Sequence, residues 1–83
     1  MDNKHIEHPE CYSESHGYAL LAAYCKERGR WAEIRLIEGA VQTLIYKPTD
    51  DGKIEIASCV SSNGNISIAN ALYNAMVYDT SNE

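Results

Sequence analysis

Four side chains near the N-terminus have the chemistry of zinc ligands. All 3 histidines of the chain and one of its cysteines follow the spacing His-x2-His-x2-Cys-x4-His, over His5, His8, Cys11 and His16. Imidazole and thiolate are ligands that zinc prefers, and a closed site would hold an otherwise irregular N-terminal arm, residues 1–12. The spacing differs from that of a zinc finger, where a longer loop separates the ligand pairs. The pattern therefore indicates either a zinc site or a chance grouping of histidines in a polar arm.

Cys11 lies between His8 and His16 in the sequence, which also suggests a nucleophile beside its base. Nucleophilic catalysis needs a further group that orients the base. No oxyanion-hole motif accompanies these residues, and a chain of 83 residues has little material for a substrate cleft. We therefore expect no enzymatic activity. Cys25 and Cys59 are expected to pack as small hydrophobic residues.

Length and charge narrow the possibilities further. The 83 residues are enough for a single small domain, residues 1–83, and the formal net charge is −5. An acidic chain is a poor ligand for phosphate backbones, so we expect no direct binding of nucleic acid and a protein partner with a basic surface. The 3 cysteines do not have the spacing of a disulfide framework, which favours a reducing, cytoplasmic location. No apolar run is long enough to predict a membrane span.

The stretch from Trp31 to Val60 predicts three short antiparallel strands. Its residues alternate between apolar and polar, and Gly39-Ala40 and Asp51-Gly52 suit two-residue turns. These turns would place Leu36 opposite Thr43, and Thr43 opposite Val60. One face of the sheet would then be mainly apolar and would form the core. Its predicted members are Ala32, Ile34, Leu36, Val41, Thr43, Ile45, Ile54, Ile56, Ser58 and Val60.

A helix is predicted on each side of these strands. Residues 13–28 carry an apolar stripe at helical spacing, and Gly29 is suited to end the helix. A second helix should begin near Asn65 or Ser67 and end near Tyr78, followed by a polar tail, residues 79–83. Both helices need the apolar sheet face. The expected fold is α+β, in the order α-β-β-β-α, with a three-stranded antiparallel meander and two helices packed on one face. The two predicted apolar stripes are Tyr18, Leu21, Ala22 and Cys25, and Ile68, Leu72, Ala75 and Met76.

This order of elements resembles that of the double-stranded-RNA-binding domain. That family uses a basic N-terminus of its second helix to reach phosphates. The corresponding segment here, residues 63–67, contains neither Lys nor Arg. The likeness therefore extends to topology and not to RNA binding.

The other face of the predicted sheet is the candidate working surface. It combines aromatic and aliphatic side chains with acidic residues, whereas a face that meets only water is usually more polar. Aromatic residues are enriched at the energetic centres of protein interfaces. This face is expected to bind a partner or to pair with a second copy of the chain. The residues predicted to bind a protein partner are Glu33, Leu44, Tyr46, Asp50, Asp51 and Glu55.

In size, acidity and lack of a catalytic motif, the whole chain resembles the small phage-encoded inhibitors of bacterial machinery, of which anti-CRISPR proteins are one group. That resemblance implies a non-enzymatic, protein-binding inhibitor of a bacterial defence or nucleic-acid-handling protein. It would act by steric block, with carboxylates taking the place of nucleic-acid phosphates on a basic surface. The alternative is a zinc-stabilised small regulator or adaptor that uses the N-terminal His and Cys residues. Without that metal site, no cofactor is expected.

Overall fold

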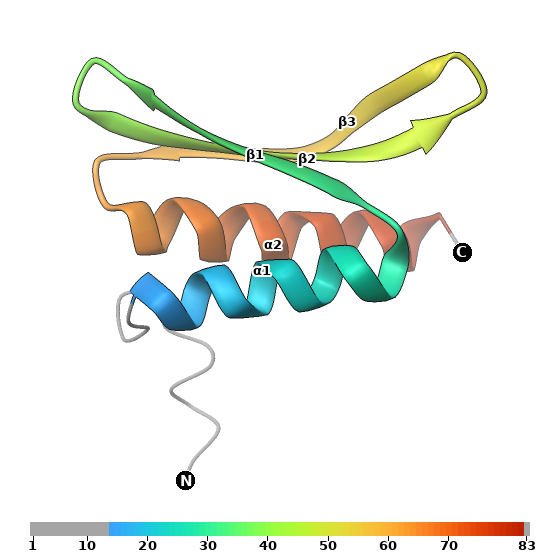
Figure 1. Ribbon diagram of the computed structural model, residues 1–83, viewed down its shortest axis with the longest axis horizontal. Coiled ribbons are helices and arrows are strands. Elements are labelled where there is room, and N and C mark those ends of the chain that lie inside the picture. Colours follow the sequence, from blue (N-terminus) through green and yellow to red (C-terminus); the bar gives the residue numbers. More distant parts are fainter. Residues whose placement is uncertain (1–13, 83) are drawn as a thin grey trace, which may run out of the picture.

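The computed structural model describes residues 14–82, and the helices and strands follow in the predicted order. The three strands form one antiparallel sheet in the order β1-β2-β3. Both helices lie on the same side of this sheet (Figure 1), so the predicted α+β fold is confirmed. We call the side toward the helices the inner face and the opposite side the outer face. The elements are α1 (Glu14–Arg28), β1 (Trp31–Ile37), β2 (Ala40–Thr49), β3 (Gly52–Ser61) and α2 (Gly64–Ser81).

The core lies between α2 and the sheet, and α1 closes it from the side. Helix α2 packs on β2 and β3, whereas α1 packs mainly on α2 and contacts the sheet chiefly at β1. Ala71 and Ala75 are fully buried, and their small side chains let α2 lie close to the strands. The sheet contributes Ile45, which is also fully buried, at its centre. The other buried apolar residues of this core are Leu21, Tyr24, Ala57 and Ile68.

Helix α1 ends where the sequence predicts. Gly29 has a φ of 67°, the left-handed conformation that glycine adopts at low cost. The amide of Arg30 donates to the carbonyl of Cys25 at 2.9 Å, which satisfies a carbonyl of the last turn. This turn directs the chain from α1 into β1.

The first hairpin turns one residue earlier than predicted. Its turn residues are Glu38 and Gly39, with φ values of 46° and 82°, and positive φ at both positions is typical of a type I′ turn. Leu36 therefore lies opposite Val41 rather than Thr43, and Thr43 lies opposite Ile34. The pairing has shifted by an even number of residues, so the predicted face of β1 is unchanged.

The second hairpin contains a bulge that changes the face of half of β3. Ile45 lies opposite Ala57 and Tyr46 lies opposite Glu55, which leaves Ile56 as the extra residue. From Ala57 to the end of β3, the two faces are exchanged relative to the prediction, so Ala57 and Cys59 face the helices. Ser58 and Val60 lie on the outer face, and their predicted place in the core is wrong. The turn itself consists of Asp50 and Asp51, because Thr49 pairs with Gly52.

Helix α2 begins earlier and ends later than predicted. Its N-cap is Asn63, whose side chain accepts a hydrogen bond from the amide of Ile66 at 3.1 Å. Ser67, a predicted cap, is instead buried, and its hydroxyl contacts that of Thr43 at 2.8 Å. The helix continues through Ser81, so residues 79–81 belong to it and the predicted polar tail is wrong there.

The predicted apolar stripes are correct in part. Leu21, Ile68 and Ala75 are buried as expected, but Tyr18 and Met76 are exposed. The stripe of α1 is rotated toward α2, because that helix packs on α2 more than on the sheet.

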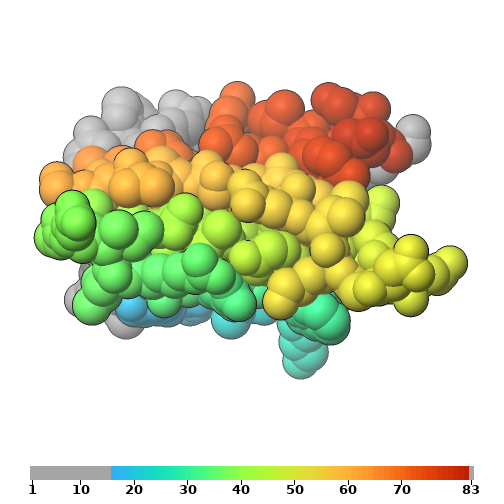
Figure 2. Space-filling view, turned by 90° about the horizontal axis from the view of Figure 1, so that it is seen from above, coloured from blue at the N-terminus to red at the C-terminus, as the bar shows by residue number. Residues whose placement is uncertain are grey.

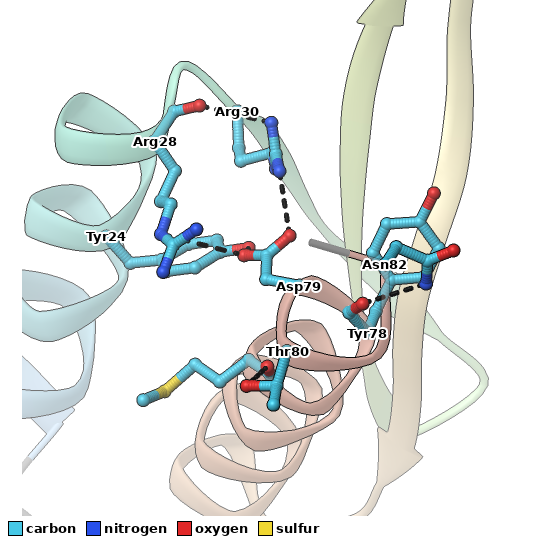
Figure 3. Close-up of polar contacts among 8 residues, drawn as sticks. Tyr24, Arg28, Arg30, Tyr78, Asp79, Thr80 and Asn82 are labelled. Carbon is cyan, nitrogen blue, oxygen red and sulfur yellow. Dashed lines mark hydrogen bonds and ion pairs between the residues drawn. The ribbon is translucent and has the colours of Figure 1, made fainter.

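A buried group of polar side chains joins the two helices at the end of the molecule shown in Figure 3. The hydroxyl of Tyr24 donates to Asp79 Oδ2 at 2.5 Å. Arg30 Nη2 lies 2.7 Å from Asp79 Oδ1, and Arg28 Nε lies 3.9 Å from Asp79 Oδ2. Asp79 is only 4% exposed, so these contacts replace the water that the carboxylate loses on folding. They connect the end of α2 to α1 and to the segment that leads into β1.

Gly17→Ala should stabilise the protein by about 0.5–1 kcal/mol, because glycine is a poor helix former. Gly17 is buried where α1 crosses α2, and an added Cβ would lie 3.7 Å from Ile68 Cγ2, an ordinary contact distance. Thermal melting followed by circular dichroism should show a rise of about 4 °C. Gly39→Ala is the control: Gly39 has a φ of 82°, so that substitution should lower the melting temperature. A melting temperature of Gly17→Ala below that of the parent would contradict this packing of α1 on α2.

Candidate protein-binding surface

The outer face brings together side chains from all three strands. Trp31 lies opposite Tyr46, and Lys53, opposite Pro48, lies one further step along the same face. Glu33 follows Trp31 on the same side of β1. We call Trp31, Glu33, Tyr46 and Lys53 the cation cluster. The strands that carry them are seen from the outer side in the space-filling view (Figure 2).

The ammonium group of Lys53 is the centre of this cluster. Its Nζ lies 5.5 Å from the centre of the Trp31 ring and 4.7 Å from that of Tyr46. It also lies 4.0 Å from Glu33 Oε2. Cation–π contacts are weak at sites open to water, so the cluster matters more for recognition than for stability. Two aromatic rings and a carboxylate are a combination that attracts ammonium and guanidinium groups.

Glu33 is held in place by two further donors. Arg35 Nη2 donates to Glu33 Oε1 at 2.8 Å, and the hydroxyl of Tyr46 donates to the same oxygen at 3.2 Å. The hydrogen bond from Arg35 is the main cause that lowers the pKa of Glu33 below 4.5. Loss of hydration and the charge of Glu33 raise the pKa of Tyr46. At neutral pH, the cluster therefore presents an ionised carboxylate beside a neutral phenol.

The outer face also contains exposed apolar residues. Trp31 is 52% exposed and Val60 is 56% exposed, and Ile37 is exposed near the other end of β1. Exposed apolar side chains rimmed by polar ones are typical of interaction sites. The outer face is thus a mixed surface with aromatic, aliphatic and acidic groups in reach of one partner.

The predicted partner-binding residues fall into three groups. Glu33 and Tyr46 belong to the cation cluster. Asp50 and Asp51 form the exposed tip of the β2–β3 hairpin, and Glu55 is exposed opposite Tyr46. Leu44 does not reach the surface: it lies on the central strand, is flanked by both edge strands, and is only 5% exposed. A partner has almost no access to Leu44, so its predicted role as an anchor is wrong.

Lys53 is the member of the site that sequence reasoning missed. It is next to the turn at residues 50–51, where a lysine suggests nothing more than a soluble hairpin. Its contact with Trp31 depends on the register of both hairpins, because β2 lies between the two strands that carry these residues. A correct prediction of the register of both hairpins would have been needed to place Lys53 beside Trp31.

The predicted zinc ligands cannot be placed together. His5, His8 and Cys11, with the rest of the arm of residues 1–12, lie outside the described residues. His16 is exposed on the first turns of α1. Within residues 14–82, no three His, Cys, Asp or Glu side chains are grouped as a metal site. Cys25 and Cys59 are partly buried against the core, and burial raises the pKa of the Cys25 thiol.

The chain was compared with models of protein families, with curated proteins and with solved structures. None of the three comparisons finds a match. Across the part of the chain that the structure describes, neither helix has the length and apolar character needed to cross a membrane.

Proposed function

We propose that this chain is a non-enzymatic, cytoplasmic protein-binding module whose outer sheet face binds a basic surface on another protein. The observation that carries this proposal is the position of Lys53. Its ammonium lies against Trp31, Tyr46 and Glu33, so the surface already binds a positive charge of the kind that a partner would bring. Lys53 is partly exposed on an edge strand, where a lysine or arginine of the partner can replace it.

The charge of the chain supports the same function. The chain has a net charge of −5, and Glu33 and Glu55 lie beside the aromatic side chains of Trp31 and Tyr46. Acidic groups on the rim increase the rate of encounter with a basic partner, whereas buried aromatic anchors supply most of the affinity. A small module that covers a basic surface in this way would block the access of nucleic acid to it. We therefore propose an inhibitor of a bacterial defence or nucleic-acid-handling protein, similar in action to the anti-CRISPR proteins.

The test is affinity capture from a bacterial lysate, followed by mass spectrometry and by measurement of binding to the partner found. Trp31→Ala and Tyr46→Ala should each weaken binding at least about tenfold, as expected for aromatic anchors. Lys53→Met frees the cluster and should leave binding unchanged or tighter. If Trp31→Ala and Tyr46→Ala bind as well as the parent, the outer face is not the binding surface.

The acidic residues should act mainly on the rate of association. Reversal of charge at Glu55, or at Asp50 and Asp51, should slow association and reduce its dependence on salt, because long-range attraction is screened by ions. Glu27→Lys, at an exposed position of α1, makes the same change of charge away from the outer face. Equal effects of Glu55→Lys and Glu27→Lys would show that net charge alone matters, and would contradict a localised site.

A further inference from the structure

Helix α2 has apolar side chains on two opposite sides. One side is buried against the sheet and α1. The other faces away from them, and its positions are about half a turn of the helix from the buried ones. A stripe of exposed apolar side chains is typical of an interaction site. We call this second side the α2 seam, and it consists of Ile66, Ala69, Tyr73, Met76 and Thr80.

Within residues 14–82, the seam is open from Tyr73 onward, whereas Ile66 and Ala69 are half-buried. Tyr73 is 66% exposed and Met76 is 53% exposed, and Val77 beside them is also exposed. Together with Thr80 and Ser81, these residues line a shallow hollow of about 290 Å³. The space-filling view in Figure 2 shows that part of α2 (orange to red) extends past the β3 side of the sheet. A partner can therefore reach the seam without disturbing the sheet.

The spacing of the seam specifies a helix as its partner. The five residues of the seam follow one another along α2 at alternating intervals of three and four residues. That is the spacing by which one helix presents a continuous line of side chains to another, with knobs packed into holes. A strand or an irregular segment would not match this repeat.

The absence of charged side chains from the seam indicates which helix can pack against it. The charged residue of α2 is Asp79, and it is turned inward to Tyr24 and Arg30. The seam is therefore neutral, although the whole chain has a net charge of −5. Two copies can meet here with no like charges in contact. We propose that the chain forms a homodimer in which the α2 seams of two copies pack together around a two-fold axis.

The ends of α2 favour an antiparallel pair. The first turn of α2 has no acidic residue, so the positive end of its dipole is not compensated from within the helix. Antiparallel packing places the positive end of each helix beside the negative end of the other. Tyr73 is then near the two-fold axis, because it lies midway along the seam. The contact is small by the standards of stable dimers, so we expect an affinity in the micromolar range.

Sedimentation velocity over a wide range of concentration tests this dimer with the full chain. The parent should change from the monomer mass of 9.3 kDa to twice that mass as concentration rises. Tyr73→Glu should weaken the dimer at least about tenfold, because it places two carboxylates near the axis. Tyr73→Lys should do the same, and an equal mixture of the two variants should dimerise again. Circular dichroism must show that both variants remain folded, as expected at an exposed position.

Val60→Glu is the matched control, since Val60 is an equally exposed apolar residue on the outer sheet face. It should leave the dimer intact. If Val60→Glu dissociates the dimer and Tyr73→Glu does not, the two copies meet through their sheets and the inference is overturned. A parent that remains monomeric at the highest concentration also overturns it, whatever covers the seam. Neither result affects the capture experiment and its binding measurements, because none of their variants changes a residue of α2.

Discussion

Asp79→Asn should destabilise the protein by about 3 kcal/mol, a large part of the total stability of so small a domain. The substitution keeps the shape of the side chain but removes its charge. Arg30, which is mostly buried 2.7 Å from the carboxylate, then loses its counter-ion. Tyr24 retains an acceptor of lower strength. The cost is therefore that of a buried charge without a partner rather than that of a missing hydrogen bond.

Urea denaturation and thermal melting measure this effect. A loss of about 3 kcal/mol corresponds to a drop of about 15 °C in melting temperature for a domain of this size. Asp51→Asn makes the same chemical change at the exposed hairpin tip and should alter stability by no more than about 0.5 kcal/mol. A double-mutant cycle with Arg30→Gln should give a coupling energy above about 1 kcal/mol. If Asp79→Asn melts within a few degrees of the parent, Asp79 does not hold the helices together.

The same carboxylate should make the fold sensitive to acid. Burial alone would raise the pKa of Asp79, but the hydrogen bonds from Tyr24 and Arg30 and the nearby positive charges outweigh burial and lower it below 3.8. A lowered pKa in the folded state contributes stability above the pKa of the unfolded chain. That contribution is lost as the pH falls below about 4. Asp79→Asn should lack this part of the acid response.

The missed end of α2 shows why the sequence alone was insufficient. A carboxylate is unfavourable near the C-terminus of a helix, where the dipole is also negative. Local preferences therefore predict that the helix ends before Asp79. In the fold, Arg28 and Arg30 supply the compensating charge from a part of the chain far away in sequence. Gly29, by contrast, acts through its own backbone and marked the end of α1 correctly.

The sheet shows the same division between local and distant causes. The alternation of β1 and β2 and the existence of both hairpins were predictable, because they depend on neighbouring residues. The bulge at Ile56 was not predictable, because no residue in β3 requires it. It places Ala57 rather than Ser58 on the face toward the helices. For the candidate site, the acidic hairpin tip was visible in the sequence. The burial of Leu44 and the contact of Lys53 with Trp31 depend on the register and on the position of each strand in the sheet.

Tyr24 should make the protein lose stability in alkali. Burial and the hydrogen bond to Asp79 raise the pKa of Tyr24 from 10.0 to about 12. Below about pH 10, this phenol is protonated in both the folded and the unfolded chain. Between about pH 10 and 12 the unfolded chain loses its proton first, so folding is disfavoured by up to about 3 kcal/mol. Urea denaturation at a series of pH values should show this decline.

Tyr24→Phe separates this contribution from those of the other tyrosines and the lysines. At pH 8 the variant should be less stable than the parent by about 2 kcal/mol, because Asp79 loses a hydrogen bond to its charged group. The phenyl ring of the variant has no hydroxyl to titrate, so the difference should shrink as the pH rises from about 10 to 12. Tyr18→Phe, on the exposed side of the same helix, should follow the parent at every pH. If the gap between Tyr24→Phe and the parent stays constant through pH 12, the buried phenol does not titrate as its contact with Asp79 requires.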